Sequence, residues 1–199
     1  KDKIRDFLKI PRESILIGSF QKDGIGWGEG FTPKYIKGPD IFIKTLEILS
    51  KKGLPIYALL TGPSRGFVKQ ELKKNGIPFY HSYVSNIDEL IPLYQALDIY
   101  LITSREEGGP MGLIESMACG IPVVTTKVGM AEDVIQHNIQ GEISNEIDPK
   151  SLANKVELIL ESLNKNKEKS QEIIRESILR FDWEEVAKQH WDKVYKDLI

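Results

Sequence analysis

Two glutamates in the middle of the chain have the residue type and spacing of a ligand site. Glu107 and Glu115 are separated by seven residues, among them the glycine-rich turn Gly108–Gly112. An apolar strand expected at Ile99–Thr103 precedes them, and Glu115 falls on a helix expected at Pro110–Cys119. Because the first turn of a helix leaves backbone N–H groups unpaired, a strand, a turn and a helix N-terminus together form an anion site.

The two carboxylates narrow the class of anion. Two glutamates at this helix end would repel a bare phosphate, whereas sugar hydroxyls donate hydrogen bonds to carboxylates. The combination indicates a ligand with both phosphate and sugar, that is, a nucleotide sugar. Spacing alone also allows both residues to have no ligand at all. Glu115 would then be an exposed helical glutamate, and Glu107 would only complement the helix dipole.

The surrounding sequence alternates short apolar runs with helical patterns. The apolar runs predict strands at Ile15–Phe20, Ile56–Thr61, Pro78–His81, Ile99–Thr103, Pro122–Thr126 and Gly141–Ser144. The helical patterns predict helices at Pro39–Lys51, Gly66–Lys74, Asp88–Leu97, Pro110–Cys119, Ala131–His137, Pro149–Leu163, Lys165–Arg180 and Trp183–Leu198. Strands that alternate with helices form a parallel sheet covered on both faces. We therefore expect an α/β fold, a Rossmann-like open parallel sheet of about six strands, in a single domain over residues 1–199.

The composition is that of one ordinary globular domain. The 199 residues are 41% hydrophobic, which is enough for a sizeable core. A net charge of −2 gives no electrostatic reason to expect nucleic acid or an anionic membrane as a partner. The single cysteine, Cys119, suits a reducing cytosol. No apolar run reaches the ~18 residues of a membrane span, and the start of the chain does not have the pattern of a signal peptide.

The ordered motifs around the two glutamates resemble the group 1 glycosyltransferases, the retaining family 4 of the GT-B fold. The signature is the Glu-x7-Glu element formed by Glu107 and Glu115. Further matching stretches follow in the family's order, at Ile17–Phe20, Lys37–Asp40, Leu60–Pro63, Leu93–Asp98 and Phe181–Trp183. Members of this family carry two such domains, and this chain begins with lysine rather than methionine. The resemblance therefore implies the C-terminal, donor-binding half, with the N-terminal acceptor domain of the same protein missing.

The resemblance also implies roles for individual residues. Glu107 would bind the donor sugar ring at the catalytic centre, and Glu115 would bind the ribose hydroxyls; neither is expected to be a nucleophile. Lys37 matches the family lysine that contacts the diphosphate. The backbone around the turn would meet the sugar and diphosphate, at Gly108, Gly109, Pro110, Met111 and Gly112.

One position departs from the family pattern. Ser19 stands where an arginine commonly follows the glycine of the first strand, and Lys22 is the expected substitute for its charge. The long glycine-rich connection from Ser19 to Gly38 would lie against the pyrophosphate. Without the resemblance, Lys22 and Lys37 would be interpreted as solvated loop lysines.

Two further groups of residues follow strands and therefore face the same edge of the sheet. Arg65 either faces the nucleotide or lies on the surface at a helix start. The resemblance places Tyr80, His81 and Ser82, with Tyr83 directly after them, in the nucleobase region, with core packing as the alternative for the aromatic side chains. The last helix, 183–198, carries an apolar stripe that we expect to pack in part toward the missing N-terminal domain.

We therefore expect the donor-binding domain of a retaining glycosyltransferase that transfers a sugar from a nucleotide diphosphate sugar, with UDP or GDP, to an unknown acceptor, in polysaccharide biosynthesis. This half alone would be inactive. No cofactor or metal is expected, because the chain contains no Asp-x-Asp. The protein would be cytoplasmic, held at the inner membrane face through its missing half. A GT-B-related nucleotide-sugar epimerase and a catalytically inactive nucleotide-binding module are the alternatives.

Overall fold

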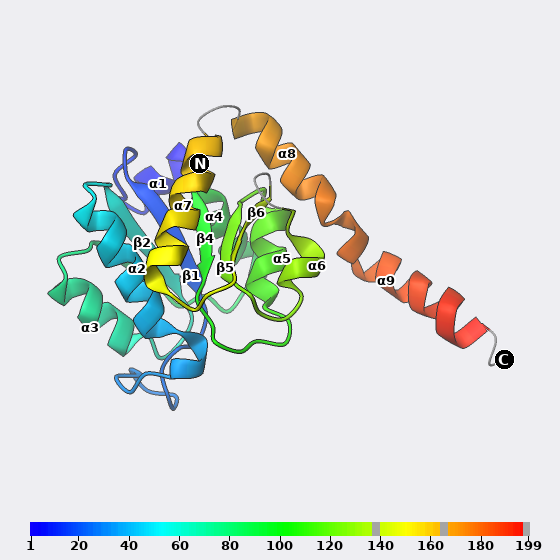
Figure 1. Cartoon of the computed structure of the whole chain (residues 1–199), viewed down its shortest axis with the longest axis horizontal. Helices are drawn as coiled ribbons and strands as arrows, with labels where there is room; N and C mark the ends of the chain where they lie inside the picture. The colour runs from blue at the N-terminus through cyan, green and yellow to red at the C-terminus, as the bar shows by residue number, and fades with distance from the viewer. Residues whose placement is uncertain (137–139, 164–166, 197–199) are drawn as a thin grey trace.

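Six parallel strands form one open sheet in the computed structural model, which describes residues 1–136, 140–163 and 167–196. The strand order is β3-β2-β1-β4-β5-β6 (Figure 1). The strands are β1 (Ile15–Phe20), β2 (Ile56–Thr61), β3 (Phe79–Ser82), β4 (Ile99–Ile102), β5 (Val123–Thr126) and β6 (Gly141–Ser144). This arrangement confirms the expected Rossmann-like α/β fold. The order reverses between β1 and β4, and in open parallel sheets such a reversal opens a crevice at the carboxyl ends of the strands.

Helices connect the strands, as the sequence pattern predicts. They are α1 (Asp2–Phe7), α2 (Pro39–Lys51), α3 (Gly66–Lys74), α4 (Ile87–Ala96), α5 (Met111–Ala118), α6 (Ala131–Val134), α7 (Pro149–Leu163), α8 (Lys167–Ser177) and α9 (Trp183–His190). The bounds of α2, α3 and α7 are as predicted, and those of α4 and α5 differ by one residue. α6 ends before the predicted boundary because Ile135 adopts an extended conformation, and the predicted end of α6 at residue 137 lies outside the described residues.

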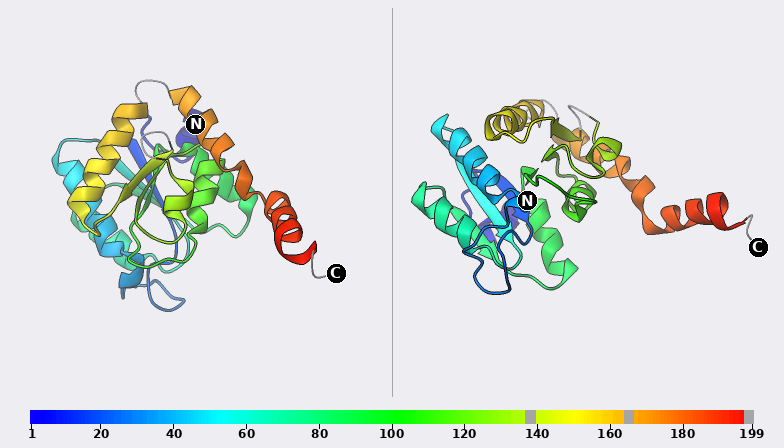
Figure 2. Two further views of the ribbon diagram at one scale, coloured as in Figure 1. Left: turned by 45° about the vertical axis from the view of Figure 1, so that its right-hand side comes forward. Right: turned by 60° about the horizontal axis from the view of Figure 1, so that its bottom comes forward.

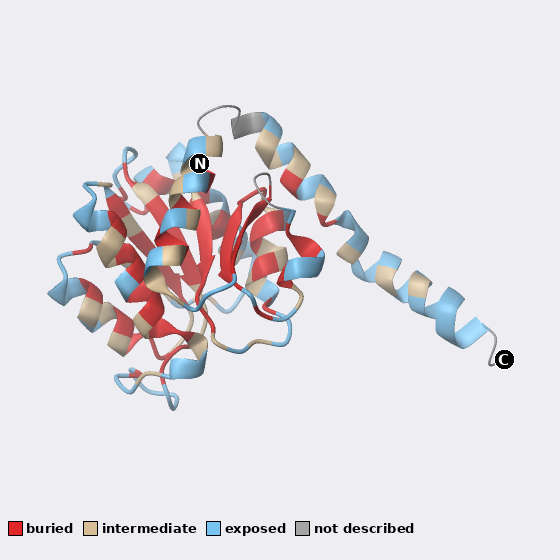
Figure 3. Ribbon diagram, in the orientation of Figure 1, coloured by how far each residue is buried: buried red, intermediate tan, exposed pale blue. Residues whose placement is uncertain are grey.

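The strands place alternate side chains on the two faces of the sheet, and each face carries its own core. Leu16 and Tyr100 pack with α4, α5, α6 and α8 on one face. Ile17 and Leu101 pack with α2, α3 and α7 on the other. The strands are buried throughout the centre of the sheet (Figure 3). This double coverage leaves the edge where the strands end as the place for ligand-binding loops.

The sequence pattern did not predict α1, which is held by a buried arginine in addition to the apolar packing of Ile4. The Arg5 guanidinium donates to the carbonyl oxygens of Ala96 at 2.9 Å and Ser14 at 2.9 Å, and forms an ion pair of 2.7 Å with Asp98. Asp98 also accepts a hydrogen bond from the Leu16 backbone N–H at 2.9 Å. These contacts fix α1 to the starts of β1 and β4, at the edge opposite the crevice.

The C-terminal helices extend away from the sheet (Figure 2). α8 contributes the buried Ile174 to one core, whereas no side chain of α9 is buried. The predicted helix Trp183–Leu198 is helical through Tyr195, but α9 ends at His190 and the following residues, Trp191–Tyr195, are π-helical. Leu198 of the predicted apolar stripe and the predicted start of α8 at residue 165 lie outside the described residues. No helix in the described ranges is long and apolar enough to cross a bilayer.

Candidate functional site

Two adjoining pockets lie at the carboxyl edge of the central strands. The lysine pocket has a volume of about 310 Å³ and is lined by Phe20, Gln21, Lys22, Lys34, Lys37, Tyr100, Ile102, Glu107, Pro110 and Gly112. The aromatic pocket has a volume of about 200 Å³ and is lined by Phe20, Gln21, Lys22, Thr61, Gly62, Pro63, Tyr83, Val84, Leu90, Tyr94 and Glu115. The pockets share the three residues at the end of β1, so they form a continuous site with one glutamate in each part.

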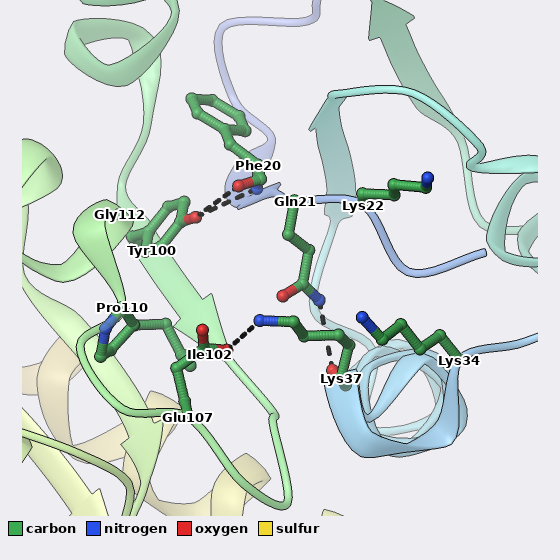
Figure 4. A pocket seen from close by; sticks show the side chains of 10 residues that line it. All are labelled: Phe20, Gln21, Lys22, Lys34, Lys37, Tyr100, Ile102, Glu107, Pro110 and Gly112. Carbon is green, nitrogen blue, oxygen red and sulfur yellow. Dashed lines mark hydrogen bonds and ion pairs between the residues drawn. The ribbon is translucent and has the colours of Figure 1, made fainter. Parts of the chain in front are cut away.

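An ion pair between Lys37 and Glu107 crosses the lysine pocket (Figure 4). The Ser104 hydroxyl donates to the same Glu107 oxygen, Oε2, at 3.1 Å. Both charged side chains are about one-fifth exposed, at 23% and 19%. The pair is therefore formed in advance of any ligand, and Oε2 has two protein partners within the described residues.

A glycine explains how Lys37 comes so close to the end of β4. Gly38 follows Lys37 with a left-handed φ of +64°, and a Cβ on it would overlap the Thr103 carbonyl group. Thr103 returns a hydrogen bond from its hydroxyl to the Gly38 carbonyl oxygen at 2.8 Å. The Lys-Gly step is thus packed directly on the strand that leads to Glu107.

Arg105, which follows β4, is a second link between the end of that strand and the segment around Lys37. Its guanidinium forms a bidentate ion pair with Asp40 in the first turn of α2, at 2.8 and 2.7 Å, and donates to the Tyr35 carbonyl oxygen at 2.6 Å. Its backbone N–H donates to the Ile36 carbonyl oxygen at 2.8 Å. Burial opposes ionisation of Asp40, but the Arg105 hydrogen bonds and charge outweigh it and lower the pKa of Asp40.

The aromatic pocket presents Glu115 against a cluster of rings. The Tyr94 hydroxyl donates to Glu115 Oε2 at 2.7 Å. Tyr94 packs against Phe20 and Tyr100 with ring centroids 4.6 and 5.4 Å apart. The Tyr100 hydroxyl lies between the Phe20 N–H and carbonyl groups, at 3.1 and 3.2 Å, and burial raises the pKa of Tyr100 to about 12. An apolar body with a carboxylate at its rim suits a nucleoside, whose ribose carries hydroxyl donors.

The first turn of α5 rests on this aromatic cluster. A Cβ on Gly112 would lie 2.8 Å from the ring carbons of Tyr100, so only glycine allows the helix to approach the ring so closely. Pro110 directly precedes the first helical residue, where a missing N–H leaves no bond unmade. The packing of Gly112 on the Tyr100 ring therefore holds the turn at the mouth of the lysine pocket.

Residues 32–177 match the family model described as "Glycosyl transferases group 1". The chain belongs to the group 1 glycosyltransferases. Over 163 residues it is 28% identical to the N-acetyl-alpha-D-glucosaminyl L-malate synthase of Bacillus anthracis, an alignment that covers 80% of this chain and 42% of that protein. The chain therefore spans less than half of this curated relative.

Solved structures share the fold of this group 1 glycosyltransferase chain. Sucrose-phosphate synthase from Thermosynechococcus elongatus matches with a TM-score of 0.76 at 21% identity, over 100% of this chain and 49% of that one. Anabaena HepE, solved in complex with UDP and glucose, matches with a TM-score of 0.73 at 20% identity, over 98% of this chain and 51% of that one. Both neighbours are about twice as long as the chain.

Two of the predicted site residues in this group 1 glycosyltransferase are buried below the pockets. Arg65 is 1% exposed, so it lies neither on the surface nor in the crevice, and both predicted positions are wrong. Its guanidinium donates to the Ser19 carbonyl oxygen at 2.6 Å and lies 3.1 Å from Asp23. The Ser19 hydroxyl accepts from Arg65 at 3.2 Å and is buried as well, so Ser19 does not line either pocket. Arg65 instead joins the ends of β1 and β2 through the Thr61 carbonyl oxygen at 2.9 Å.

The long connection after β1 is folded against the turn after β2. Gly24 and Gly30 pack on the backbone of Ser64, whose hydroxyl lies 3.0 Å from the carbonyl oxygens of Gly26 and Gly28. Gln21 and Lys22 at its start and Lys34 and Lys37 near its end line the pockets. The Lys22 ammonium group lies over the ring of the exposed Trp27, 3.7 Å from its centroid.

Other predicted residues occupy places at the margin of the pockets. Tyr80, His81 and Ser82 are the last three residues of β3, and His81 Nε2 bonds the Gly62 carbonyl oxygen at 3.0 Å. Of the run predicted to lie near the nucleobase, Tyr83 lines the aromatic pocket, together with Val84. The Met111 side chain lines an apolar groove beside α9 rather than the lysine pocket. Gly108 and Gly109 lie in the turn between Glu107 and Pro110 without lining either pocket.

Sequence reasoning missed several pocket residues. Lys34 and Phe20 line the lysine pocket, and Tyr94 contacts Glu115. Tyr94 stood inside the matched stretch Leu93–Asp98, but no spacing rule relates it to Glu115. The signal that could have identified Lys34 is its place in the same connection as Lys22 and Lys37.

Proposed function

We propose that this chain is the donor-binding half of a retaining glycosyltransferase that transfers a sugar from a nucleotide diphosphate sugar. The observation that carries the proposal is the division of the site: Glu107 lies among lysines, and Glu115 lies among aromatic rings in the adjoining pocket. A diphosphate would bind the lysines, with the sugar at Glu107 and the ribose at Glu115. The pockets share Phe20, Gln21 and Lys22, which is the continuity that one ligand spanning both requires.

The charges in the lysine pocket suit a diphosphate leaving group. Lys37 is paired with Glu107, whereas no ion pair of Lys22 or Lys34 is found within the described residues. Three ammonium groups against one carboxylate leave a surplus of positive charge. As the bond between sugar and phosphate breaks, negative charge grows on the diphosphate, and groups already in place stabilise it without reorganisation. Glu107 would act on the sugar ring through hydrogen bonds and not as a nucleophile.

The acceptor and the transfer step would need the rest of the protein. Because the chain spans about half the length of the relatives and neighbours it matches, we expect this half alone to bind donor but not to transfer sugar. A uridine nucleotide is the first donor to test, since a structural neighbour is solved with UDP and glucose. We expect binding without a metal ion, because the chain contains no Asp-x-Asp; chelation with EDTA should leave the affinity unchanged.

A second candidate is a nucleotide-binding module without transferase activity. It is favoured by Ser19, which stands in place of the family arginine and whose hydroxyl is committed to Arg65. The two candidates separate in the protein with its missing half restored: a transferase turns over a nucleotide sugar, whereas an inactive module binds it unchanged.

Calorimetric titration of the chain with UDP, GDP and ADP, followed by their common sugar conjugates, tests the proposal. We expect one nucleotide to bind selectively, and Glu115→Gln to weaken it about tenfold or more, as for a hydrogen bond to a charged group. Failure of all three nucleotides to bind both this chain and the protein with its missing half would overturn the proposal.

A further inference from the structure

Tyr94 is a buried tyrosine whose hydroxyl group donates a hydrogen bond to Glu115. The side chain is 1% exposed and packs in the cluster of Phe20 and Tyr100. Its hydroxyl donates to Glu115 Oε2 at 2.7 Å, and no other donor to the Glu115 carboxylate is found within the described residues. Tyr94 comes from α4 and Glu115 from α5, so the bond joins two helices at the wall of the aromatic pocket.

Packing alone does not require this hydroxyl group. A phenylalanine would fill the same space against the two rings, and a buried hydroxyl costs free energy unless it is hydrogen-bonded. Burial, Tyr100 and the Glu115 carboxylate raise the pKa of Tyr94, so the hydroxyl keeps its proton and remains a donor at every physiological pH. The Tyr94 hydroxyl therefore donates its hydrogen bond to Glu115 throughout the physiological pH range.

We propose that Tyr94 is a positioning residue that orients the Glu115 carboxylate for the two ribose hydroxyls and so sets the preference for ribonucleotides over deoxyribonucleotides. The inference rests on the proposed function, which assigns Glu115 to the ribose. Each carboxylate oxygen accepts about two hydrogen bonds. With one site of Oε2 occupied by Tyr94, Oε1 and the second site of Oε2 are open to adjacent hydroxyls. Without Tyr94, the terminal torsion of the glutamate has no fixed orientation, because such torsions are broad.

Titration of Tyr94→Phe tests this inference with matched nucleotide pairs. The probes are UDP, GDP and ADP, each with its 2′-deoxy counterpart. We expect the parent chain to prefer the ribonucleotide about tenfold. Tyr94→Phe should lower ribonucleotide affinity by about three- to tenfold and deoxyribonucleotide affinity by a smaller factor, because the deoxyribose keeps only one of the two hydroxyls; the preference is thereby reduced. Tyr57→Phe is the matched control: its ring packs against the same core, and its hydroxyl has no hydrogen bond within the described residues.

The double variant Tyr94→Phe/Glu115→Gln supplies a second readout. If Tyr94 acts through Glu115, the double variant should lose no more ribonucleotide affinity than Glu115→Gln alone. Equal weakening of both nucleotides by Tyr94→Phe, or fully additive losses in the double variant, would overturn the positioning role while leaving the proposed function intact. A parent chain that binds ribo- and deoxyribonucleotides equally would instead overturn the assignment of Glu115, and the inference with it.

Discussion

The Lys37–Glu107 ion pair lies at the centre of the site at the scale of single residues. Each partner neutralises the other before any ligand arrives, and both keep some exposure to the pocket. In the proposed function, a nucleotide sugar would exchange this pair for two better ones, with Lys37 turning to the diphosphate and Glu107 to the sugar hydroxyls. The pair would then hold both groups near their working positions at small cost in conformational entropy.

Glu107→Gln should therefore have opposite effects on two ligands. The variant releases Lys37, so the affinity for the free nucleoside diphosphate should stay equal or rise. The additional affinity that the sugar group supplies should fall by about tenfold, since a charged acceptor is lost. Calorimetry with UDP and UDP-glucose measures both effects. Equal weakening of both ligands would show instead that Glu107 contacts the nucleotide itself.

Gly112 offers a test of the packing that supports the turn. Gly112→Ala places a methyl group within 2.8 Å of the Tyr100 ring carbons, and overpacking of this kind lowers the free energy of unfolding by about 1–3 kcal/mol. Gly108→Ala is the control in the same turn, because a Cβ there meets no atom within 4 Å. Urea unfolding measures both. Equal stability of the two variants would contradict the close approach of α5 to Tyr100.

At the scale of elements, Arg105 joins the segment that carries Lys37 to the loop that carries Glu107. Lysine at position 105 keeps the charge but loses the bidentate geometry with Asp40. Arg105→Lys should lower nucleotide affinity by about three- to tenfold while the melting temperature changes little. Arg12→Lys, in the exposed pair with Asp6, should leave binding unchanged. A large loss of stability without loss of affinity would assign Arg105 to the fold alone.

The junction of α1 with β1 and β4 predicts how stability depends on pH. Burial opposes ionisation of Asp98, but the charges of Lys1 and Arg5 outweigh it, so the pKa of Asp98 lies below its ordinary value of 3.8. An acid with a lowered pKa stabilises the fold above its unfolded-state pKa, and this contribution is lost as the pH falls through the folded-state value. The free energy of unfolding should therefore drop below about pH 4.

Asp98→Asn tests that pH dependence. The variant should lose less stability than the parent chain between pH 7 and pH 3, because its side chain no longer titrates. Urea unfolding at the two pH values gives the comparison, with the exposed Asp192→Asn as the control. An unchanged pH dependence in Asp98→Asn would contradict the role of Asp98.

The sequence pattern predicted the elements best where each one buries a continuous apolar face. β1, β2, β6, α2, α3 and α7 have the expected bounds because their own residues supply the burial. α1 was missed because its stability comes largely from hydrogen bonds of Arg5 to Ala96 and Asp98, far along the chain. For the last helix, the apolar stripe predicted the helical segment but not the π-helical hydrogen bonding of Trp191–Tyr195.

The site was predictable only in part, for a related reason. Glu107, Glu115, Lys22 and Lys37 follow strands and therefore reach the same edge of the sheet. The burial of Arg65 depends on carbonyl groups at the ends of two strands and on Asp23, none of which forms a local pattern. Tyr94 likewise meets Glu115 only because α4 and α5 pack side by side on one face of the sheet.

At the scale of the whole molecule, the C-terminal segment, residues 183–196, exposes large apolar side chains. Trp183 is 78% exposed, and Trp191, Val194 and Tyr195 are about half exposed. Figure 1 shows this segment extending away from the sheet. Since the chain spans about half of the proteins it matches, we propose that the full protein has an N-terminal half and that this half covers the segment.

The double variant Trp191→Ser/Tyr195→Ser tests that proposal. It should leave the melting temperature of this chain nearly unchanged, because both side chains are exposed. In the protein with its missing half restored, the same variant should lower the melting temperature by several degrees. Equal and small effects in both proteins would show that the N-terminal half packs elsewhere.

The most direct test of the proposed donor site is a structure of the chain with its nucleoside diphosphate bound. We predict ribose hydroxyls within about 2.7–2.9 Å of the Glu115 carboxylate, and diphosphate oxygens at a similar distance from at least one of Lys22, Lys34 and Lys37. The base would lie in the aromatic pocket beside Tyr83. A nucleotide bound elsewhere, or one that leaves the Glu115 carboxylate without contact, would contradict the division of the site between the two glutamates.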